Sequence, residues 1–288
     1  MAQERWTVQR VIQWTTEHFQ KKGLDNPRLE AEVLLAHLLE MDRMGLYLNY
    51  DRPLKEEERT AYREMIQRRQ AWEPTAYIVG TKEFWSLSFA VSPECLIPRP
   101  ETEHLVEEAV RIGKGLKPPL RVLEIGQGCG AVAIALATEL GEAQIVATDI
   151  SPGACSLAQA NAARHGVEGR IRVVVGDLFP VGEEPFGLIC SNPPYIPTAE
   201  VLALAPEVRD YEPLTALDGG EDGLRFFRRI AQGASAFLVA GGWLLLEMGQ
   251  GQAPQVATIL QEQGFAQIDL IPDHAGVKRV IKAQWVGK

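Results

Sequence analysis

The feature that most constrains the fold is a short apolar run that ends in a glycine-rich turn. Residues 122–125 (Val-Leu-Glu-Ile) are followed by Gly126-Gln127-Gly128-Cys129-Gly130, and a helical pattern begins directly afterwards. Three closely spaced glycines let the backbone turn tightly and come close to a ligand. A strand, such a turn and a helix in this order predict one unit of an open α/β sheet.

The chain after about residue 118 continues to alternate between strands and helices. Strands are predicted at residues 121–125, 144–148, 171–175, 188–191 and 243–247. This alternation indicates a mostly parallel sheet that is covered by helices on both faces. Two late runs, 265–270 and 279–283, favour an antiparallel hairpin at one edge of the sheet. We therefore predict an α/β, Rossmann-like fold for this part of the chain.

The chain before this region has a different pattern. Apolar residues recur at helical spacing over the first 75 residues, and the last of three predicted helices covers residues 55–71. Alternating apolar residues then predict a β-hairpin over 83–98, with its turn at Ser92-Pro93-Glu94. We expect three parts: a small helical domain over residues 1–80, a β-hairpin linker over 81–98 and the α/β domain over 99–288.

Composition narrows the class of protein. The 288 residues are 46% hydrophobic and 23% charged, as in ordinary globular proteins, and no apolar run is long enough to span a bilayer. The net charge of −9 argues against a general nucleic-acid binder. The four cysteines lack metal-binding spacing, and the first residues do not resemble a signal peptide. We expect a cytoplasmic, monomeric protein without a metal site.

The acidic residues at the predicted strand ends indicate which ligand the glycine turn binds. Glu124 would repel a pyrophosphate, but it suits the α-amino group of S-adenosylmethionine. The Gly-x-Gly-x-Gly spacing also differs from the Gly-x-Gly-x-x-Gly of dinucleotide sites. Asp149 follows the second strand, where a carboxylate can accept both ribose hydroxyls. The alternative for Asp149 is capping of the next helix, for which Ser151 competes.

The third strand ends in Gly176-Asp177-Leu178-Phe179. Asp177 could accept from the adenine amino group, and Leu178 and Phe179 could pack near the ring. The alternative for Asp177 is an ordinary turn aspartate.

The tetrapeptide Asn192-Pro193-Pro194-Tyr195 follows the fourth strand. A planar –NH2 nitrogen is a poor nucleophile because its lone pair is delocalised, so it must be held with that lone pair directed at the methyl carbon. The Asn192 side-chain oxygen and the Pro193 carbonyl can accept its two N–H bonds, while the prolines fix φ and offer no competing donor. The Tyr195 ring can lie against the planar group and exclude water. The alternative is a proline turn with an aromatic plug.

Together these residues resemble the release factor glutamine methyltransferase family, a branch of the class I S-adenosylmethionine-dependent methyltransferases. The resemblance covers nearly the whole chain. It includes residues 207–213 (Glu-Val-Arg-Asp-Tyr-Glu-Pro), and it is most specific over 97–103 (Ile-Pro-Arg-Pro-Glu-Thr-Glu) and over the stretch from Glu212-Pro213 to Ala-Leu-Asp-Gly-Gly at 216–220. The chain departs from the family pattern at Glu124, where Asp is common, and at Gln127 and Cys129, where small hydroxyl residues are common.

The resemblance implies a helical N-terminal domain that docks the substrate, a hairpin and a methyltransferase domain. It also implies methyl transfer from S-adenosylmethionine, leaving S-adenosylhomocysteine, to the side-chain N5 of the glutamine in the Gly-Gly-Gln motif of class 1 peptide chain release factors. By position, Gly126–Gly130 and Asp149 would bind the cofactor, Asp177 and Leu178 would border the adenine, and residues 192–195 would hold the glutamine amide.

Three alternatives remain open from the residues. The acceptor could be a glutamine of a ribosomal protein, or an adenine or cytosine amino group that is flipped against Tyr195. Net acidity argues against the nucleic-acid acceptor. The third alternative is a scaffold that binds S-adenosylmethionine without turnover, which the intact Asn-Pro-Pro-Tyr sequence disfavours.

Overall fold

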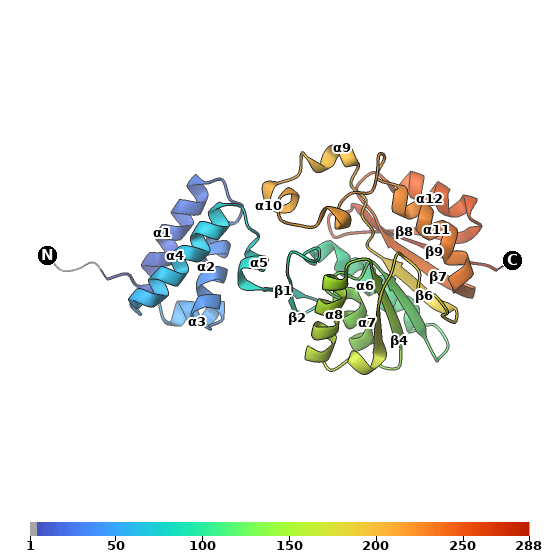
Figure 1. The fold of residues 1–288 in the computed structure, drawn as a ribbon, viewed down its shortest axis with the longest axis horizontal. Helices are drawn as coiled ribbons and strands as arrows, with labels where there is room; N and C mark the ends of the chain where they lie inside the picture. The colour runs from blue at the N-terminus through green and yellow to red at the C-terminus, as the bar shows by residue number, and fades with distance from the viewer. Residues whose placement is uncertain (1–4, 288) are drawn as a thin grey trace. The chain divides into compact units, whose positions relative to one another are not determined.

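The computed structural model describes residues 5–287. Its internal contacts divide the chain into two compact units. The first, here called the helical unit, contains the chain up to Gly80 together with Pro206–Tyr211. The second, the α/β unit, contains Thr81–Ala205 and the chain from Glu212 onward, so the β-hairpin packs with the sheet domain (Figure 1).

The helical unit is built on five helices of the N-terminal region: α1 (Val8–Lys21), α2 (Pro27–Leu38), α3 (Arg43–Leu48), α4 (Glu56–Gln70) and α5 (Thr75–Val79). The prediction of a helix near residues 55–71 is confirmed by α4. Its start is fixed by the Glu58 carboxylate, which accepts from the Lys55 backbone N–H at 2.8 Å. Apolar side chains of α1, α2 and α4, among them Phe19, Leu34 and Tyr62, form a separate buried core.

A short segment from late in the chain completes this unit. It contains α10 (Pro206–Arg209) and ends at Tyr211. The Arg69 side chain on α4 is only 3% exposed and donates to Glu30 at 2.9 Å and to Glu207 at 2.6 Å. The Tyr211 hydroxyl donates to the Ala71 carbonyl at 2.7 Å. Buried charge pairing therefore ties this late segment to the N-terminal helices.

The α/β unit contains a seven-stranded sheet in the order β5-β4-β3-β6-β7-β9-β8. Its strands are β3 (Arg121–Ile125), β4 (Gln144–Asp149), β5 (Ile171–Val175), β6 (Phe186–Ser191), β7 (Leu238–Glu247), β8 (Phe265–Pro272) and β9 (Lys278–Trp285). The first five are parallel, whereas β9 pairs antiparallel with both β7 and β8. The predicted Rossmann-like sheet with an antiparallel edge is confirmed.

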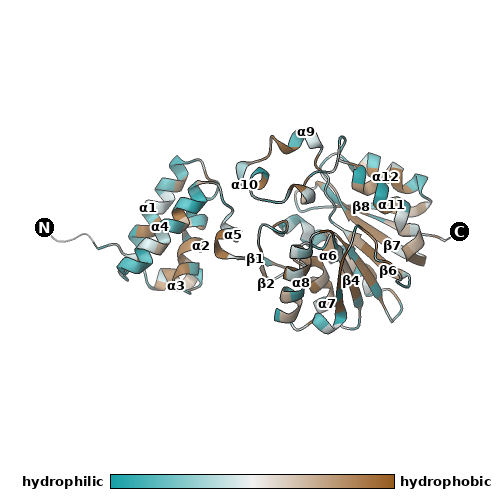
Figure 2. Cartoon of the chain, in the orientation of Figure 1, coloured by the Kyte–Doolittle hydropathy of each residue, from teal (hydrophilic) through white to brown (hydrophobic). Residues whose placement is uncertain are grey.

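Helices cover both faces of this sheet (Figure 1). On one face lie α6 (Glu103–Gly113), α7 (Ala131–Glu139) and α8 (Pro152–Arg164), and on the other lie α11 (Arg225–Phe237) and α12 (Ala253–Glu262). Leu123 and Ile125 of β3 share one buried cluster with Phe227 of α11. The strands are accordingly among the most hydrophobic parts of the chain in Figure 2.

The β-hairpin is shorter than predicted. It consists of β1 (Thr81–Phe84) and β2 (Leu87–Ala90), joined by Trp85 and Ser86 at φ 53° and 55°. Two central residues with positive φ are typical of the tightest hairpin turns. The predicted hairpin over 83–98 with a turn at Ser92-Pro93-Glu94 is therefore wrong, because those residues follow the hairpin and Trp-Ser carries no turn signature.

Short elements complete the α/β unit: η1 (Pro100–Thr102), η2 (Glu168–Arg170), α9 (Thr198–Val201) and η3 (Leu214–Ala216). Across the described residues, none of the helices is long and apolar enough to cross a membrane.

Candidate active site

The glycine turn adopts a backbone that other residues rarely accept. Gly126, Gly128 and Gly130 all have positive φ, and α7 begins immediately after Gly130. A Cβ atom at Gly130 would lie 3.0 Å from the Cβ of Ala158, so α8 packs directly against the turn. The backbone N–H groups of Gly126 and Gln127 donate to the Thr148 carbonyl, which joins the turn to the end of β4.

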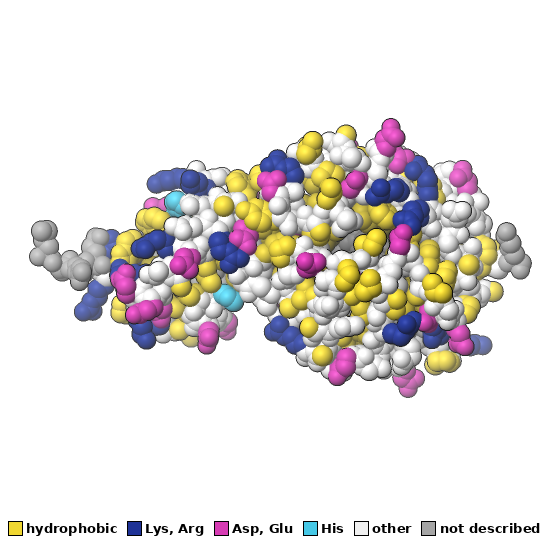
Figure 3. Space-filling model, viewed as in Figure 1, with side chains coloured by type: hydrophobic (Ala, Val, Ile, Leu, Met, Phe, Trp, Pro, Cys, Tyr) yellow, Lys and Arg dark blue, Asp and Glu magenta, His cyan; other side chains and the backbone are white. Residues whose placement is uncertain are grey.

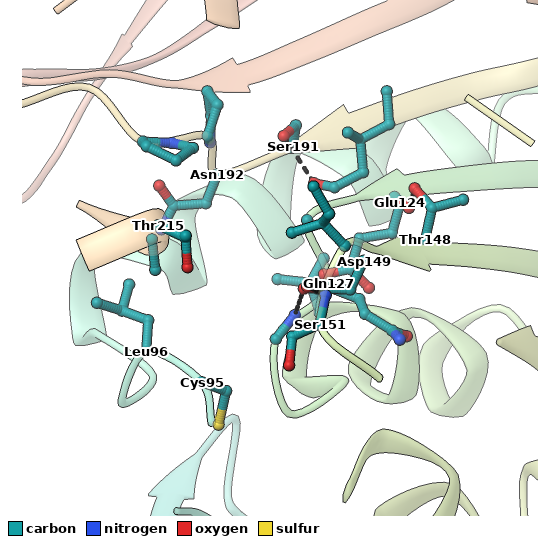
Figure 4. A pocket seen from close by; sticks show the side chains of 18 of the residues that line it. Cys95, Leu96, Glu124, Gln127, Thr148, Asp149, Ser151, Ser191, Asn192 and Thr215 are labelled. Carbon is teal, nitrogen blue, oxygen red and sulfur yellow. Dashed lines mark hydrogen bonds between the residues drawn. The ribbon is translucent and has the colours of Figure 1, made fainter. Parts of the chain in front are cut away.

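A cavity of about 420 Å³ opens at this edge of the sheet, where the parallel strands end. It is lined by most of the residues that the sequence singled out: Glu124, Gly126, Gln127, Gly128, Cys129, Asp149, Asp177, Leu178, Asn192, Pro193 and Pro194. Figure 4 shows Glu124, Gln127, Asp149 and Ser151 on one side of the cavity and Asn192 with Thr215 on the other. In the space-filling view, hydrophobic side chains surround a hollow on the visible face of the α/β unit (Figure 3).

Glu124 is a buried acid at this cavity. Its Oε2 accepts from the Ala133 backbone N–H at 2.8 Å, and burial raises its pKa to about 8. The neighbouring Gln127 is also buried, and its Oε1 has no hydrogen-bond partner among the described residues. A buried carboxyl group at one end of a cavity suits a cationic ammonium group, which can donate to it. This acceptor fits S-adenosylmethionine.

Asp149 connects two of the strand ends. Its carboxylate accepts from the backbone N–H groups of Gly128 and Ser151, both at 2.9 Å. Ser151, rather than Asp149, caps α8, since its hydroxyl accepts from the Ala154 N–H at 3.1 Å. Burial raises the pKa of Asp149 although these hydrogen bonds oppose the shift. The capping interpretation of Asp149 is therefore wrong, and its carboxylate borders the cavity.

The end of β5 contributes a polar residue and an apolar one. Asp177 pairs with Arg229 of α11 at 2.8 Å, and both residues line the cavity. Leu178 has φ 66° and lines the cavity beside Phe226. Phe179 turns away from it and stacks on Phe237, with the ring centroids 4.7 Å apart. Leu178 and Phe226, unlike Phe179, are thus among the apolar groups that line the cavity and are available to a planar ring.

The Asn-Pro-Pro-Tyr loop leaves β6 directly opposite the glycine turn. The Ser191 hydroxyl donates to the Ile125 carbonyl at 2.7 Å, which holds the loop to the end of β3 (Figure 4). Asn192 Nδ2 donates to Thr102 Oγ1 at 3.1 Å, so the amide oxygen points away from Thr102. Tyr195 does not line the cavity but packs against the sheet core, where burial raises its pKa to about 12.

A glycine-rich segment supports the loop from behind. The backbone of Ile196 exchanges hydrogen bonds with Leu217 and Gly219, and the Gln252 side chain donates to the Tyr195 carbonyl at 2.9 Å. A Cβ atom at Gly223 would lie 2.4 Å from that carbonyl oxygen. The Ala-Leu-Asp-Gly-Gly motif at 216–220 therefore acts on the loop through close backbone packing.

Several residues of the site were not predicted from the sequence. Arg99 and the backbone N–H of Ile97 both donate to the buried Glu212 carboxylate, at 2.5 Å and 3.2 Å. This pairing joins the Ile-Pro-Arg-Pro-Glu-Thr-Glu motif to the Glu-Pro motif at 212–213, and Arg99 and Pro213 line the cavity. Thr102 and Phe226 also line it. In the sequence, the one sign that Arg99 and Glu212 belong to the same site is that each lies in a recognisable motif.

The sheet, the glycine turn and the loop at the cavity define a class I methyltransferase. A family model described as "Methyltransferase domain" matches residues 122–211, and one described as "PrmC N-terminal domain" matches residues 10–80. A solved methyltransferase from Pyrococcus furiosus has the same fold, with a TM-score of 0.53 and 20% identity over 72% of this chain and 92% of that one.

Two curated relatives define the family. The chain is 49% identical to the release factor glutamine methyltransferase of Geobacter sulfurreducens, over 96% of both chains. It is 42% identical to that of Rhodopirellula baltica, over 97% of this chain and 96% of the other. The chain belongs to the release factor glutamine methyltransferase family.

Proposed function

We propose that this protein transfers a methyl group from S-adenosylmethionine to the side-chain N5 of the glutamine in the Gly-Gly-Gln motif of class 1 peptide chain release factors. Relatives that share up to 49% identity over nearly the full length carry the name of this activity. The observation that carries the proposal is the loop after β6, whose residues Asn192, Pro193 and Pro194 line the same cavity as Glu124 and Asp149.

The cofactor end of the cavity supports binding by complementary charge. Glu124 and Gln127 would hold the α-amino group, and Asp149 would accept from the ribose hydroxyls. Gly126, Gly128 and Gly130, with Cys129 between the last two, would let the backbone approach the methionine portion. Asp177 and Leu178 would border the adenine. When bound, the cofactor supplies a methyl group on a positively charged sulfur, which is already an activated leaving group.

The loop would position the acceptor. Asn192 Oδ1 and the Pro193 carbonyl would each accept one N–H of the glutamine amide, which directs the nitrogen lone pair at the methyl carbon. Pro194 keeps the loop rigid, and Tyr195 behind it excludes water. Once methylated, the amide nitrogen would still carry its two hydrogens together with a positive charge, and it would readily lose one proton to water. For this reason the site needs no strong general base.

We assign docking of the release factor to the predicted helical domain over residues 1–80, and we place the protein in the cytoplasm as a monomer. The predicted methyltransferase domain over 99–288 would carry the chemistry, with the β-hairpin linker over 81–98 joining the two along the chain.

The direct test uses radiolabelled S-adenosylmethionine and a purified class 1 release factor. Label in the wild-type factor, and none in a factor with Gln→Ala in its Gly-Gly-Gln motif, is the expected result. Label found instead in a ribosomal protein or in nucleic acid would keep the methyltransferase assignment and overturn the acceptor. An absence of transfer to every acceptor, with the cofactor still bound, would support the scaffold alternative.

A further inference from the structure

The direction of the Asn192 amide decides whether it can serve a substrate amide. An asparagine side chain presents an acceptor at Oδ1 and two donors at Nδ2, and only Oδ1 can receive an N–H from the glutamine. In the structure Nδ2 donates to Thr102 Oγ1 at 3.1 Å. Thr102 is buried at the end of η1, ninety residues earlier in the chain.

A buried acid lies behind this pair. Glu247 ends β7, and the pairing of Ser191 with Leu246 brings Glu247 level with Asn192. The Glu247 residue is 2% exposed, and its Oε2 has no hydrogen-bond partner among the described residues. The Thr102 side chain is near enough to this carboxylate for a hydrogen bond that lowers the Glu247 pKa, against the larger effect of burial.

We propose that Glu247 and Thr102 form a relay that fixes the direction of the Asn192 amide. An ionised carboxylate only accepts hydrogen bonds, so the single proton of the Thr102 hydroxyl is committed to Glu247. The Thr102 oxygen can then only accept from Asn192, which forces Nδ2 toward Thr102 and Oδ1 toward the cavity. The inference rests on the proposed function, because the relay matters only if Oδ1 must accept an N–H.

Loss of the relay has a definite structural consequence. Without an acceptor at position 247, the Thr102 hydroxyl can rotate and donate to Asn192 Oδ1. The flipped Asn192 amide would direct its N–H donors at the N–H donors of the substrate glutamine. The glutamine nitrogen that receives the methyl group would then not be held in place. Thr102 is therefore a positioning residue that acts through Asn192.

The kinetic test compares Thr102→Val, which keeps the shape, with Thr102→Ser, which restores the hydroxyl. We expect Thr102→Val to lower kcat by about tenfold or more, the effect of one misdirected hydrogen bond, while the KM for the release factor and the Kd for S-adenosylmethionine stay within about twofold. Thr102→Ser should recover most of kcat. The control is Thr258→Val, since Thr258 is exposed on α12 and its hydroxyl donates to the Pro254 carbonyl of its own helix.

A kcat of Thr102→Val equal to wild type, or a serine variant no better than the valine variant, would overturn the relay. A second measurement is independent of turnover: the side-chain NH2 resonances of Asn192 in the cofactor-free protein, identified by their absence in Asn192→Ala. Thr102→Val and Glu247→Leu, which removes the acceptor at position 247, should both shift these resonances, and unchanged resonances would reject the relay. If the wild-type protein methylates a different substrate, the proposed function fails. The relay is then tested separately, by the kcat of the same variants on that substrate and by the Asn192 side-chain NH2 resonances.

Discussion

The Asp149 carboxylate accepts from the Gly128 backbone N–H at 2.9 Å, which joins the end of β4 to the glycine turn after β3. One side chain therefore shapes the turn and offers oxygen atoms to the cavity. Asp149→Ala should weaken S-adenosylmethionine binding by at least about tenfold and lower the free energy of unfolding by about 1–3 kcal/mol, because buried N–H donors lose their acceptor. Calorimetric titration and denaturant unfolding measure the two effects.

The matched control is Asp210→Ala, which removes an exposed carboxylate that pairs with the adjacent Arg209. A cofactor affinity for Asp149→Ala equal to that of this control would reject the role of Asp149.

The raised pKa of Glu124, about 8, predicts a pH-dependent cofactor affinity. Below this pH the Glu124 carboxyl is protonated in the cofactor-free protein. An ammonium group binds best to the ionised carboxylate, after that proton has left. Affinity should therefore rise with pH up to about 8, by up to about tenfold per unit. Glu124→Gln should bind more weakly and show a flatter dependence in titrations at several pH values. The titration of the cofactor itself affects the wild type and Glu124→Gln equally. If affinity changes with pH by the same slope in both proteins, Glu124 is not the group that binds the ammonium.

Removal of the proposed acceptor oxygen should separate chemistry from cofactor binding. Asn192→Ala should lower kcat by about a hundredfold or more, because the substrate nitrogen is no longer positioned. The Kd for S-adenosylmethionine should change by less than about threefold, since the carboxylates of Glu124 and Asp149 remain. Single-turnover methylation and calorimetry check the two halves. Retained turnover in Asn192→Ala would exclude the proposed role of the amide.

Gly223 packs closely on the Tyr195 carbonyl, so we predict that a methyl group added at position 223, outside the cavity, lowers activity. Gly223→Ala should displace the loop and lower kcat by about tenfold or more. Gly251→Ala is the matched control, because Gly251 also has positive φ but a Cβ atom added there would meet nothing within 4 Å. Both variants should lose about 1–2 kcal/mol of unfolding free energy from backbone strain, and only Gly223→Ala should lose turnover. Equal activity in both would show that the loop tolerates the displacement.

The relay predicts that turnover depends on the ionisation of Glu247, whose pKa burial raises to about 7. The charged and titratable groups that act on it are Glu101, which raises the pKa, and Arg99 and Arg279, which lower it; Tyr195 lies close by. As pH falls through about 7, Glu247 gains a proton that it can donate to Thr102 Oγ1, which frees the Thr102 hydroxyl to donate to Asn192 Oδ1, and kcat should fall. Glu247→Leu, which has no acceptor, should have a low kcat that no longer changes in this range. A wild-type acidic limb that persists in Glu247→Leu would assign it to another group.

The sequence predicted the sheet well because strands buried on both faces are continuous apolar runs, as at Ile189 and Cys190. It placed the hairpin turn wrongly because Trp85 and Ser86 adopt positive φ without glycine or asparagine. The residues at strand ends could be predicted because parallel strands end at one edge. Thr102 could not be identified as a partner of Asn192, since ninety residues separate them and only the folded chain brings them together.

The segment Pro206–Tyr211 has a practical consequence for dissecting the protein. Because it packs with the N-terminal helices but continues covalently into the α/β unit at both ends, the polypeptide passes between the two units three times. A truncation that begins at Thr81 would leave Glu207 without Arg69 and Tyr211 without the Ala71 carbonyl. The freed residues are followed directly by Glu212, which holds Arg99 and Ile97 at the cavity. Removal of the N-terminal helices is therefore not a neutral way to isolate the catalytic half, and a chimera with a foreign helical unit has to carry a matching 206–211 segment.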